Sequence, residues 1–342
     1  MLGKRKKFFL KKELTLIMVE FADVEAAYKR ISDLINQTPI MTSRTLNKRV
    51  GGSVFIKCEN YQRIGAFKFR GASNKLKLLS DEEKAKGVVT HSSGNHAQAV
   101  SLASTLLGID AVIVMPDNAP EVKVRATKGY GAKVVRCDSN VKAREETCQQ
   151  LIDEHGYTLV HPYDDDQIIA GAGTAAYELI KEVGDVNYMF CPVGGGGLLS
   201  GTSIATKGLC QEAKVIGVEP ERADDAYRSY KDNKIYPSIY PDTIADGLRT
   251  SLSERTFKII RENVDEIVTV SEKEIIDAMK FLWVRMKMVV EPSGAVSVAG
   301  VMKTSDRLKN KKVGAIISGG NIDLDDFFDV FYEKVSKKKK KA

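Results

Sequence analysis

The stretch NYMFCPVGGGGLLSGTSIATKG (187–208) passes from an apolar run into four glycines and then into a helical pattern. A buried strand over 186–191 followed by a helix over 197–208 is typical of an α/β fold. Consecutive glycines let backbone amides wrap closely around a phosphate, although a tight strand-to-helix turn is the simpler alternative. The four glycines are Gly194, Gly195, Gly196 and Gly197.

This glycine run matches neither of the two common nucleotide motifs. A Walker loop needs Gly-Lys-Ser/Thr after its glycines, and none follows here. The G-x-G-x-x-G fingerprint would need a glycine at 199 or 200, where the chain has Leu199 and Ser200. Glu219 ends a strand about twenty residues later, where a dinucleotide enzyme grips the ribose. The failed glycine spacing nevertheless argues against NAD.

Outward from this stretch, short β-branched runs alternate with amphipathic segments along the chain. Strands are predicted at 53–58, 87–91, 110–115, 132–137, 186–191, 214–218, 266–270 and 313–318. Helices are predicted at 24–36, 67–79, 96–107, 167–183, 197–208, 271–288 and 322–335. Capping boxes at Ser80…Glu83 and Ser271…Glu274 mark two helix starts. The alternation predicts an α/β fold with parallel sheet.

The stretch VFIKCENYQRIGAFKFRGAS (54–73) supplies a candidate nucleophile. Lys68 is predicted in the first turn of a helix, between Phe67 and Phe69. Aromatic neighbours and the helix dipole both disfavour the charged amine there. A neutral, partly desolvated amine attacks carbonyl groups. An ordinary lysine on the surface of an amphipathic helix is the alternative.

Two polar loops also follow predicted strands. Residues 92–96, Ser-Ser-Gly-Asn-His, open a helix whose first amides suit a carboxylate. Residues 318–321, Ser-Gly-Gly-Asn, offer a hydroxyl that is able to bond a ring nitrogen. Plain helix capping explains the second loop equally well, but it explains only one of the polar residues in the first. An amine, a phosphate cradle, a carboxylate site and a ring-facing hydroxyl together match pyridoxal phosphate (PLP).

At these motifs the chain resembles the fold-type II PLP enzymes of the serine racemase and serine/threonine dehydratase group. The resemblance runs from about residue 20 to residue 333. It implies a tryptophan synthase β-like fold, in which two lobes each have a mostly parallel sheet flanked by helices. The matching motifs are GAFKFRGA (65–72), SSGNHAQA (92–99), VGGGGLLSG (193–201), TIADGLR (243–249), EPSGA (291–295) and SGGN (318–321).

The resemblance implies roles for individual residues. Lys68 would hold the cofactor as an internal aldimine, Phe67 would lie against the ring, and Asn95 would bond the phenolic oxygen. Ser318 would face the pyridine nitrogen. The phosphate would be held by Gly194, Gly195, Gly196, Gly197 and Leu198. The substrate would be bound by Ser92, Ser93, Asn95, His96 and Arg144.

These roles imply a serine racemase that acts through an external aldimine. Lys68 would remove the Cα proton on one face, and Ser93 would carry the proton on the other. Loss of the β-hydroxyl would give pyruvate and ammonia, and the neutral Ser318 suits such elimination. The alternative is a dehydratase of L-serine, L-threonine or 3-hydroxyaspartate with little racemisation. A catalytically silent PLP-binding or nucleotide-binding regulatory protein is a third hypothesis, and the intact Lys68, Ser93 and Ser318 argue against it.

The stretch VEPERADDAYRS (218–229) is similar to the divalent-cation site of serine racemases. The resemblance gives Glu219, the Ala223 carbonyl and Asp225 as ligands. Oxygen ligands suit Mg²⁺, Ca²⁺ or Mn²⁺. The resemblance also suggests a homodimer, and ATP stimulates some relatives, although no motif here decides that. Asp164, Asp165 and Asp166 form a solvated turn or, if they border the site, repel acidic substrates.

Charge and composition limit the other classes. The net charge of +7 comes from two tails, since residues 1–12 and 334–342 carry six positive charges each and 13–333 carry −5. Such a body does not favour nucleic-acid binding. No stretch reaches the roughly 18 apolar residues of a membrane span. Five scattered cysteines without a C-x-x-C pair predict reduced thiols in the cytoplasm.

No linker or change in composition divides the chain, and the resemblance implies its domain organisation. The expected divisions are a basic tail (1–19), a large PLP-binding domain (20–86 plus 161–333), a small mobile domain (87–160) and a Lys-rich tail (334–342).

Overall fold

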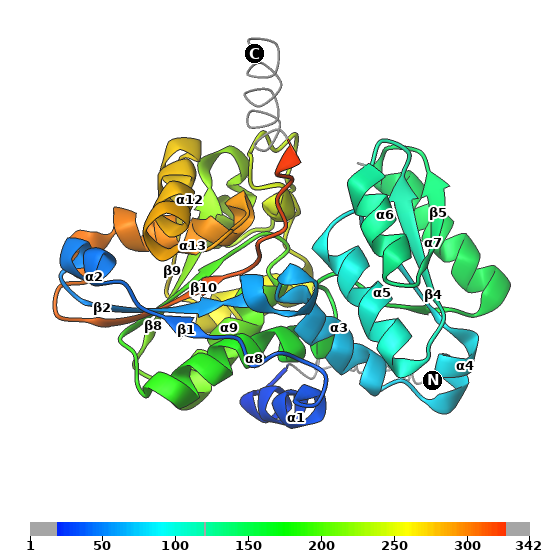
Figure 1. Ribbon diagram of the computed structural model, residues 1–342, viewed down its shortest axis with the longest axis horizontal. Coiled ribbons are helices and arrows are strands. Elements are labelled where there is room, and N and C mark those ends of the chain that lie inside the picture. Colours follow the sequence, from blue (N-terminus) through cyan, green and yellow to red (C-terminus); the bar gives the residue numbers. More distant parts are fainter. Residues whose placement is uncertain (1–18, 120, 326–342) are drawn as a thin grey trace, which may run out of the picture.

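The computed structural model describes residues 19–119 and 121–325, and it is an α/β structure with two regions of parallel sheet (Figure 1). Both predicted tails lie outside these residues, apart from Val19. The predicted helix over 322–335 is not helical at 322–324, and most of its remainder lies outside the described residues.

The larger sheet has six strands in the order β1-β2-β10-β7-β8-β9. Every neighbouring pair is parallel except β1 and β2. Its strands are β1 (Ile40–Met41), β2 (Ser53–Cys58), β7 (Tyr188–Pro192), β8 (Lys214–Pro220), β9 (Glu266–Val270) and β10 (Lys312–Ile317). The smaller sheet is wholly parallel in the order β5-β4-β3-β6. Its strands are β3 (Val88–His91), β4 (Ala111–Pro116), β5 (Lys133–Cys137) and β6 (Thr158–Leu159).

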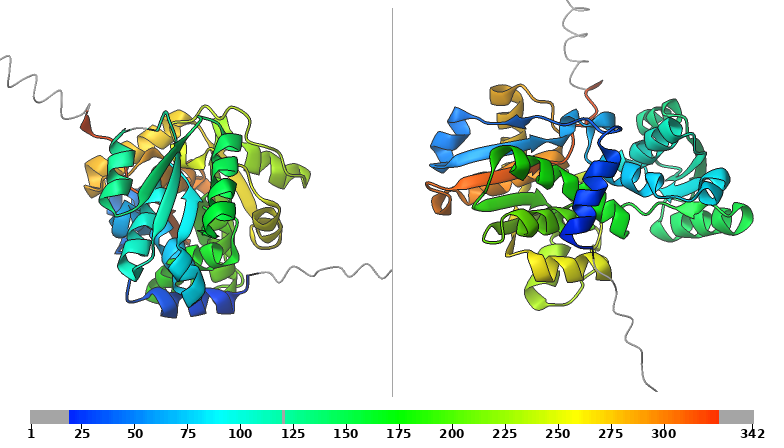
Figure 2. Two further views of the ribbon diagram at one scale, coloured as in Figure 1. Left: turned by 90° about the vertical axis from the view of Figure 1, so that its right-hand side faces the viewer. Right: turned by 90° about the horizontal axis from the view of Figure 1, so that it is seen from below.

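Helices cover both faces of each sheet (Figures 1 and 2). The first half of the chain has α1 (Phe21–Ile31), α2 (Arg44–Val50), α3 (Lys68–Lys77), α4 (Asp81–Lys86), α5 (Asn95–Leu107), α6 (Glu121–Gly129) and α7 (Val141–His155). The second half has α8 (Asp166–Val183), α9 (Gly197–Leu209), α10 (Asp225–Asp232), α11 (Glu254–Asn263), α12 (Glu272–Met286) and α13 (Pro292–Lys303).

Successive side chains of a strand point to opposite faces of the sheet and therefore pack into different hydrophobic cores. In β7, Met189 and Cys191 pack with α8 and α9, whereas Phe190 packs with α13. In β3, Val88 packs with α5 and Val89 packs with α7. None of the helices in the described ranges is both long enough and apolar enough to cross a membrane.

The eight predicted strands all occur, with ends within two residues of the prediction. The two-residue strands β1 and β6 were not predicted, because two residues show no periodicity. Helices α2, α4, α6, α7, α10, α11 and α13 lie outside the predicted segments, although the capping box at Ser80 predicted where α4 begins. Both predicted capping boxes are present, at the starts of α4 and α12. The α/β fold with parallel sheet is therefore confirmed.

The topology places the polar loops close together. Strand β10 is parallel to both β2 and β7, so the loops after these strands share one edge of the larger sheet. Residues 318–321 follow β10 and residues 194–197 follow β7. The loop 92–96 follows β3 at the corresponding edge of the smaller sheet and faces them across a pocket.

Candidate active site

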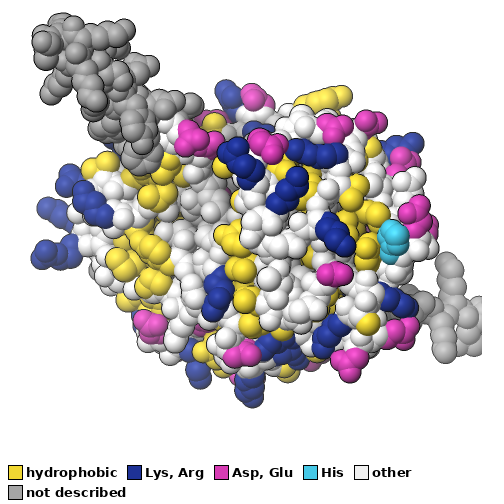
Figure 3. Space-filling view, turned by 45° about the vertical axis from the view of Figure 1, so that its right-hand side comes forward, with side chains coloured by type: hydrophobic (Ala, Val, Ile, Leu, Met, Phe, Trp, Pro, Cys, Tyr) yellow, Lys and Arg dark blue, Asp and Glu magenta, His cyan; other side chains and the backbone are white. Residues whose placement is uncertain are grey.

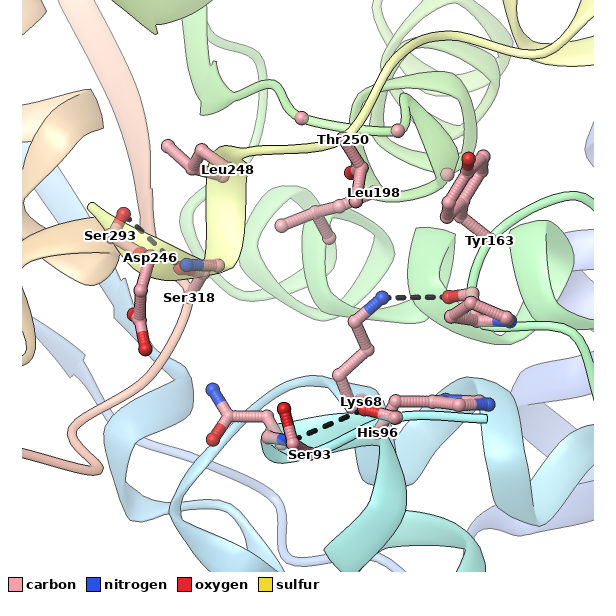
Figure 4. Close-up of a pocket in the computed structure, with 18 of the residues that line it drawn as sticks. Lys68, Ser93, His96, Tyr163, Leu198, Asp246, Leu248, Thr250, Ser293 and Ser318 are labelled. Carbon is pink, nitrogen blue, oxygen red and sulfur yellow. Dashed lines mark hydrogen bonds between the residues drawn. The ribbon is translucent and has the colours of Figure 1, made fainter. Parts of the chain in front are cut away.

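A pocket of about 330 Å³ lies where these loops converge (Figure 4). The structure brings all of the predicted cofactor and substrate residues to its wall. Those that line it are Phe67, Lys68, Ser92, Ser93, Asn95, His96, Arg144, Gly194, Gly195, Gly196, Gly197, Leu198 and Ser318. The three predicted cation ligands, Glu219, Ala223 and Asp225, do not line it.

Lys68 is the first residue of α3 and points into this pocket (Figure 4). Its Nζ donates a hydrogen bond to the Pro162 carbonyl oxygen at 2.7 Å and lies 5.1 Å from the centre of the Phe67 ring. Burial lowers the pKa of the Lys68 amine to about 8. A substantial neutral fraction near pH 8 makes this amine both a nucleophile and a base.

A buried cluster of four charged side chains holds α3 in place behind Lys68. The Arg70 guanidinium donates two hydrogen bonds to the Glu59 carboxylate (2.7 and 2.9 Å) and two to the Glu178 carboxylate of α8 (2.8 and 2.8 Å). Lys57 Nζ adds a 2.7 Å ion pair with Glu178. Burial alone would raise the pKa of Glu59, but the Arg70 guanidinium lowers it below its ordinary value. The cluster ties β2, α3 and α8 together.

In the glycine loop (194–197), Gly195 and Gly197 pack directly against Tyr163, which leaves no space for a side chain at either position. A Cβ at Gly195 would lie 2.5 Å from the Tyr163 ring, and one at Gly197 would lie 2.9 Å from Tyr163 Cβ. Gly196 has φ +87°, a conformation that favours glycine. Helix α9 begins at Gly197, so the amides of its first turn have no acceptor within the helix. An anion is the natural partner for such amides.

Asn95 joins the loop after β3 to the larger sheet. Its Nδ2 donates to Glu291 Oε1 at 2.9 Å, and its Oδ1 accepts from Asn321 Nδ2 at 2.8 Å. Burial raises the pKa of Glu291 to about 8, so this carboxyl group is largely protonated at neutral pH. The Asn321 Nδ2 also donates to the Ile64 carbonyl oxygen at 2.6 Å. Asn95 is therefore held in one orientation.

His96 has only one of its ring nitrogens bonded. Nε2 lies 3.0 Å from the Val160 carbonyl oxygen, so it carries the proton in the neutral ring. Nδ1 is buried and has no hydrogen-bond partner in the described structure. Burial lowers the pKa of His96 well below its ordinary value, so Nδ1 is an acceptor. Its predicted contact with the substrate carboxylate would require a proton on Nδ1 and stays a prediction.

Arg144, near the start of α7, is a cation without an anionic partner among the described residues. Its Nε is buried and makes no hydrogen bond within the part of the chain that is described. The side chain lines the pocket and, after burial, is the largest influence that lowers the pKa of His91. An unsatisfied guanidinium in a pocket is suited to a carboxylate.

The predicted cation ligands lie beyond the pocket, at the end of β8 and the start of α10. Glu219 accepts hydrogen bonds from the amides of Ala226 (2.9 Å) and Tyr227 (2.7 Å). Both carboxylate oxygens of Asp225 are buried and lack a well-formed hydrogen bond to any described residue, although the nearby Ser238 hydroxyl acts to lower the Asp225 pKa. Burial raises the pKa of Asp225 to about 6, and burial followed by the Asp225 charge raises that of Glu219 well above its ordinary value. A cation would relieve both effects.

The three consecutive aspartates do not line the pocket. Arg255 pairs with Asp164 at 2.7 Å and with Asp166 at 2.9 Å. Asp165 pairs with Lys75 at 2.7 Å and accepts from two amides at the start of α8. The cluster is therefore an anchored helix start with compensated charge, so it does not repel an acidic substrate as a lining group would.

Several other residues line the pocket and were not predicted. Lys123 of α6 forms a 2.9 Å ion pair with Asp246, and the pair connects the small-sheet and large-sheet sides of the pocket. Asp246 lies in the TIADGLR motif and Glu291 in the EPSGA motif, so the sequence held a signal that both could belong to the site. Lys123 and Tyr163 carry no local signal, because their positions depend on how distant loops meet. The additional lining residues include Lys123, Tyr163, Asp246, Thr250, Glu291 and Ser293.

A family model described as "Pyridoxal-phosphate dependent enzyme" matches residues 31–319. The chain belongs to this family. L-threo-3-hydroxyaspartate ammonia-lyase of Saccharomyces cerevisiae is 49% identical over 90% of this chain and 95% of its own length. Serine racemase of Schizosaccharomyces pombe is 47% identical over 91% of this chain and 96% of its own length.

Solved structures agree with this membership. The crystal structure of serine racemase from Dictyostelium discoideum has a TM-score of 0.86 and 47% identity, and the match covers 90% of this chain and 99% of that one. The structure of maize serine racemase has a TM-score of 0.91 and 39% identity, and the match covers 93% and 98% of the two chains. The fold-type II PLP architecture expected from the sequence is thereby confirmed.

The pocket of this PLP-dependent enzyme fits its cofactor. The amine of lowered pKa at Lys68 is suited to the cofactor aldehyde. Side-chain-free amides at 194–197 and at the start of α9 are suited to its phosphate. Ser318, which follows β10, lines the same pocket, and its hydroxyl donates a long 3.4 Å hydrogen bond to the Ser293 carbonyl oxygen. When bound there, PLP would withdraw electrons from the substrate Cα and so acidify its proton.

Proposed function

We propose that this enzyme is a serine racemase, which interconverts L- and D-serine and also eliminates serine to pyruvate and ammonia. The observation that carries the proposal is the presence of two proton carriers from different elements in one pocket, the Lys68 amine and the Ser93 hydroxyl (Figure 4). Relatives named serine racemase at 47% and 48% identity support it.

In the proposed mechanism the chain's own groups bind the substrate and move its proton. Amides at the start of α5, with Ser92, would receive the substrate carboxylate. Lys68 Nζ would take the Cα proton, and Ser93 Oγ would return one from the other side of the substrate. A hydroxyl has a high pKa, so Ser93 would serve mainly as a donor. In elimination, the Lys68 ammonium would donate its proton to the β-hydroxyl of the substrate, which would then leave as water.

The proposal also covers a bound divalent cation, the oligomeric state of the enzyme and its cellular compartment. We propose that Glu219, the Ala223 carbonyl and Asp225 hold Mg²⁺, with Ca²⁺ or Mn²⁺ as substitutes. We propose a cytoplasmic homodimer, in which the small domain (87–160) closes on the large one (20–86 plus 161–333). Activation by ATP is part of the same proposal. Figure 3 shows acidic and basic side chains interspersed over one face, which does not favour nucleic acid as a partner.

A second candidate is a 3-hydroxyaspartate dehydratase, and Arg144 is the observation that favours it. Its Nε is buried without a partner at the wall of the pocket, where the second carboxylate of a dicarboxylic substrate would satisfy it. Relatives with this activity are 45–49% identical to the chain. Arg144→Met with Arg125→Met as the control separates the candidates, because a selective loss on 3-hydroxyaspartate assigns the guanidinium to its second carboxylate.

A solvent-isotope experiment tests the lead proposal. The holoenzyme is incubated with L-serine in D₂O, and both serine enantiomers and pyruvate are analysed at low conversion. Two proton carriers on opposite faces predict D-serine with deuterium at Cα, while the recovered L-serine keeps more of its protium. Formation of pyruvate without any D-serine would contradict racemisation and support the dehydratase.

A further inference from the structure

The only hydrogen bond that Lys68 Nζ makes to a described residue is to the backbone carbonyl oxygen of Pro162, at 2.7 Å (Figure 4). Pro162 lies in the loop between β6 and α8, nearly a hundred residues further along the chain than Lys68. The direction of that carbonyl therefore depends on the local shape of the loop. An ammonium group bonds a carbonyl more strongly than a neutral amine does, because the bond is charge-assisted.

The shape of the loop is set by the imidazole of His161. Its Nδ1 accepts hydrogen bonds from the amide of Asp164 at 2.8 Å and from that of Tyr163 at 3.3 Å. This arrangement is the turn that an asparagine makes when its side-chain oxygen accepts from the amides that follow it. The turn encloses the peptide of Pro162. Loss of the Nδ1 acceptor would free two amides and with them the Pro162 carbonyl.

The surroundings of His161 keep Nδ1 unprotonated. Burial is the main cause, and with the nearby His91 it lowers the pKa of His161 to about 4. The titratable groups near the ring lie on four segments, and all but Tyr163 interact with it through their charge. They are His91 on β3, His96 on α5, Lys68 on α3, and Tyr163, Asp164 and Asp165 on its own loop. The His91 ring lies edge-on at 6.0 Å and the Tyr163 ring edge-on at 4.8 Å. The ring is thus held in place as well as kept neutral.

We propose that His161 is a positioning residue for Lys68: its Nδ1 shapes the turn 161–164 so that the Pro162 carbonyl receives the Lys68 amine while that amine carries a proton. This inference rests on the proposed function, in which Lys68 accepts the Cα proton. When that C–H bond breaks, the proton goes to Nζ and the electron pair stays with the substrate. The Pro162 carbonyl then stabilises the resulting ammonium in a buried place that otherwise disfavours it.

Two isosteric variants test this role. In His161→Asn the side-chain oxygen occupies the position of Nδ1, whereas in His161→Gln it reaches that of Nε2, so only asparagine preserves the turn. His155→Asn and His155→Gln are the controls, because His155 is half exposed at the end of α7 and does not line the pocket. Thermal unfolding checks that all four proteins are folded.

The first readout does not depend on activity. The full chain is stripped of cofactor, labelled with an amine-selective reagent across pH 6–10, and the Lys68 peptide is quantified by mass spectrometry. His161→Asn is expected to titrate like the wild type. In His161→Gln the Lys68 ammonium loses its acceptor, so its acid dissociation constant should rise about tenfold. Equal titration of the two variants, whether like the wild type or shifted, would overturn the proposal.

The second readout uses the holoenzyme. His161→Gln is expected to lower kcat about tenfold with little change in KM, and its rate should begin to rise at lower pH, while His161→Asn restores both. A change in KM alone, or one that both variants share, would contradict the positioning role. If the wild type forms neither D-serine nor pyruvate, the proposed function fails, yet the labelling comparison still decides how His161 acts on Lys68.

Discussion

Replacing Gly195 with alanine should weaken cofactor binding through a single steric contact. The new Cβ would lie 2.5–2.6 Å from three carbons of the Tyr163 ring, which is closer than real Cβ contacts come. Gly195 is not among the glycines with positive φ, so alanine adds no backbone strain at this position. The ring and the loop must then move apart.

The expected magnitude follows from overpacking. Forcing a methyl group into a packed site typically costs about 1–3 kcal/mol. If the loop yields, the phosphate amides lose their arrangement, and cofactor affinity should fall by roughly fivefold to 150-fold. Titration of the cofactor-free protein with PLP, followed by absorbance, measures this affinity. Thermal unfolding in the absence of cofactor shows how much of the cost falls on folding instead.

A second substitution checks the cause. Tyr163→Ala removes all three clashing carbons, so Gly195→Ala in that background should cost clearly less affinity than it does in the wild type. Gly129→Ala is the matched control, because a Cβ there meets nothing within 4 Å. If Gly195→Ala bound PLP like the wild type, or if the Tyr163→Ala background left its effect unchanged, the packing argument would be refuted.

Three further predictions concern buried charges. Arg70→Met leaves two buried carboxylates facing one lysine and should lower the free energy of unfolding by about 3–5 kcal/mol in urea, whereas a loss under about 1 kcal/mol would show that the cluster tolerates imbalance. Below pH 8, cofactor-free Lys68→Met should have a free energy of unfolding about 1–2 kcal/mol higher than the wild type, because it lacks the buried ammonium. This value is smaller than the full pKa shift would give, because water in the pocket screens the charge. The gap should close as pH rises from about 8 to the ordinary amine pKa, since the buried amine then loses its proton in both states, and a pH-independent gap would contradict this. Mg²⁺ at a hundredfold excess over its Kd should stabilise the wild type by about 2.7 kcal/mol but leave Glu219→Gln unchanged, and an equal response of the variant would place the cation elsewhere.

Much of the fold could be predicted because its signals are local. Strand β7, the glycines at 194–197 and helix α9 lie within one short stretch, and the alternation of apolar runs with such helices predicts parallel sheet. The short strand β6 and helices such as α10 and α11 were not predicted. Their places depend on what they pack against, as where the Tyr230 hydroxyl of α10 bonds the Val264 carbonyl after α11 at 2.8 Å.

The residues of the pocket also fall into two groups, those that a local motif predicts and those that only the packed structure reveals. Ser318 directly follows β10, and Lys68 opens the first α-helix after β2, so the parallel topology brings both to one edge of the larger sheet. Tyr163 and Lys123 reach the pocket only because distant loops meet there, and no pattern in one sequence records that meeting. The role of Arg70 could not be predicted from the motif that contains it, because its burial between two carboxylates is a property of the packed structure.

The acid cluster shows why residue type alone misleads. Three aspartates in succession predict a solvated turn, but Asp165 caps α8 and Arg255 compensates both of its neighbours. A positive partner ninety residues away cannot be inferred from the loop itself. The consequence for substrate choice is direct, because the cluster no longer argues against a dicarboxylic substrate.

The most direct test of the central claim compares the wild type with Ser93→Ala in one assay. Each holoenzyme is incubated with L-serine and Mg²⁺, then D-serine is measured by chiral chromatography and pyruvate in the same tube. The account predicts D-serine from the wild type and its loss in Ser93→Ala, because no second proton carrier then serves the opposite face. Pyruvate without D-serine from the wild type, or D-serine that persists in Ser93→Ala, would contradict it.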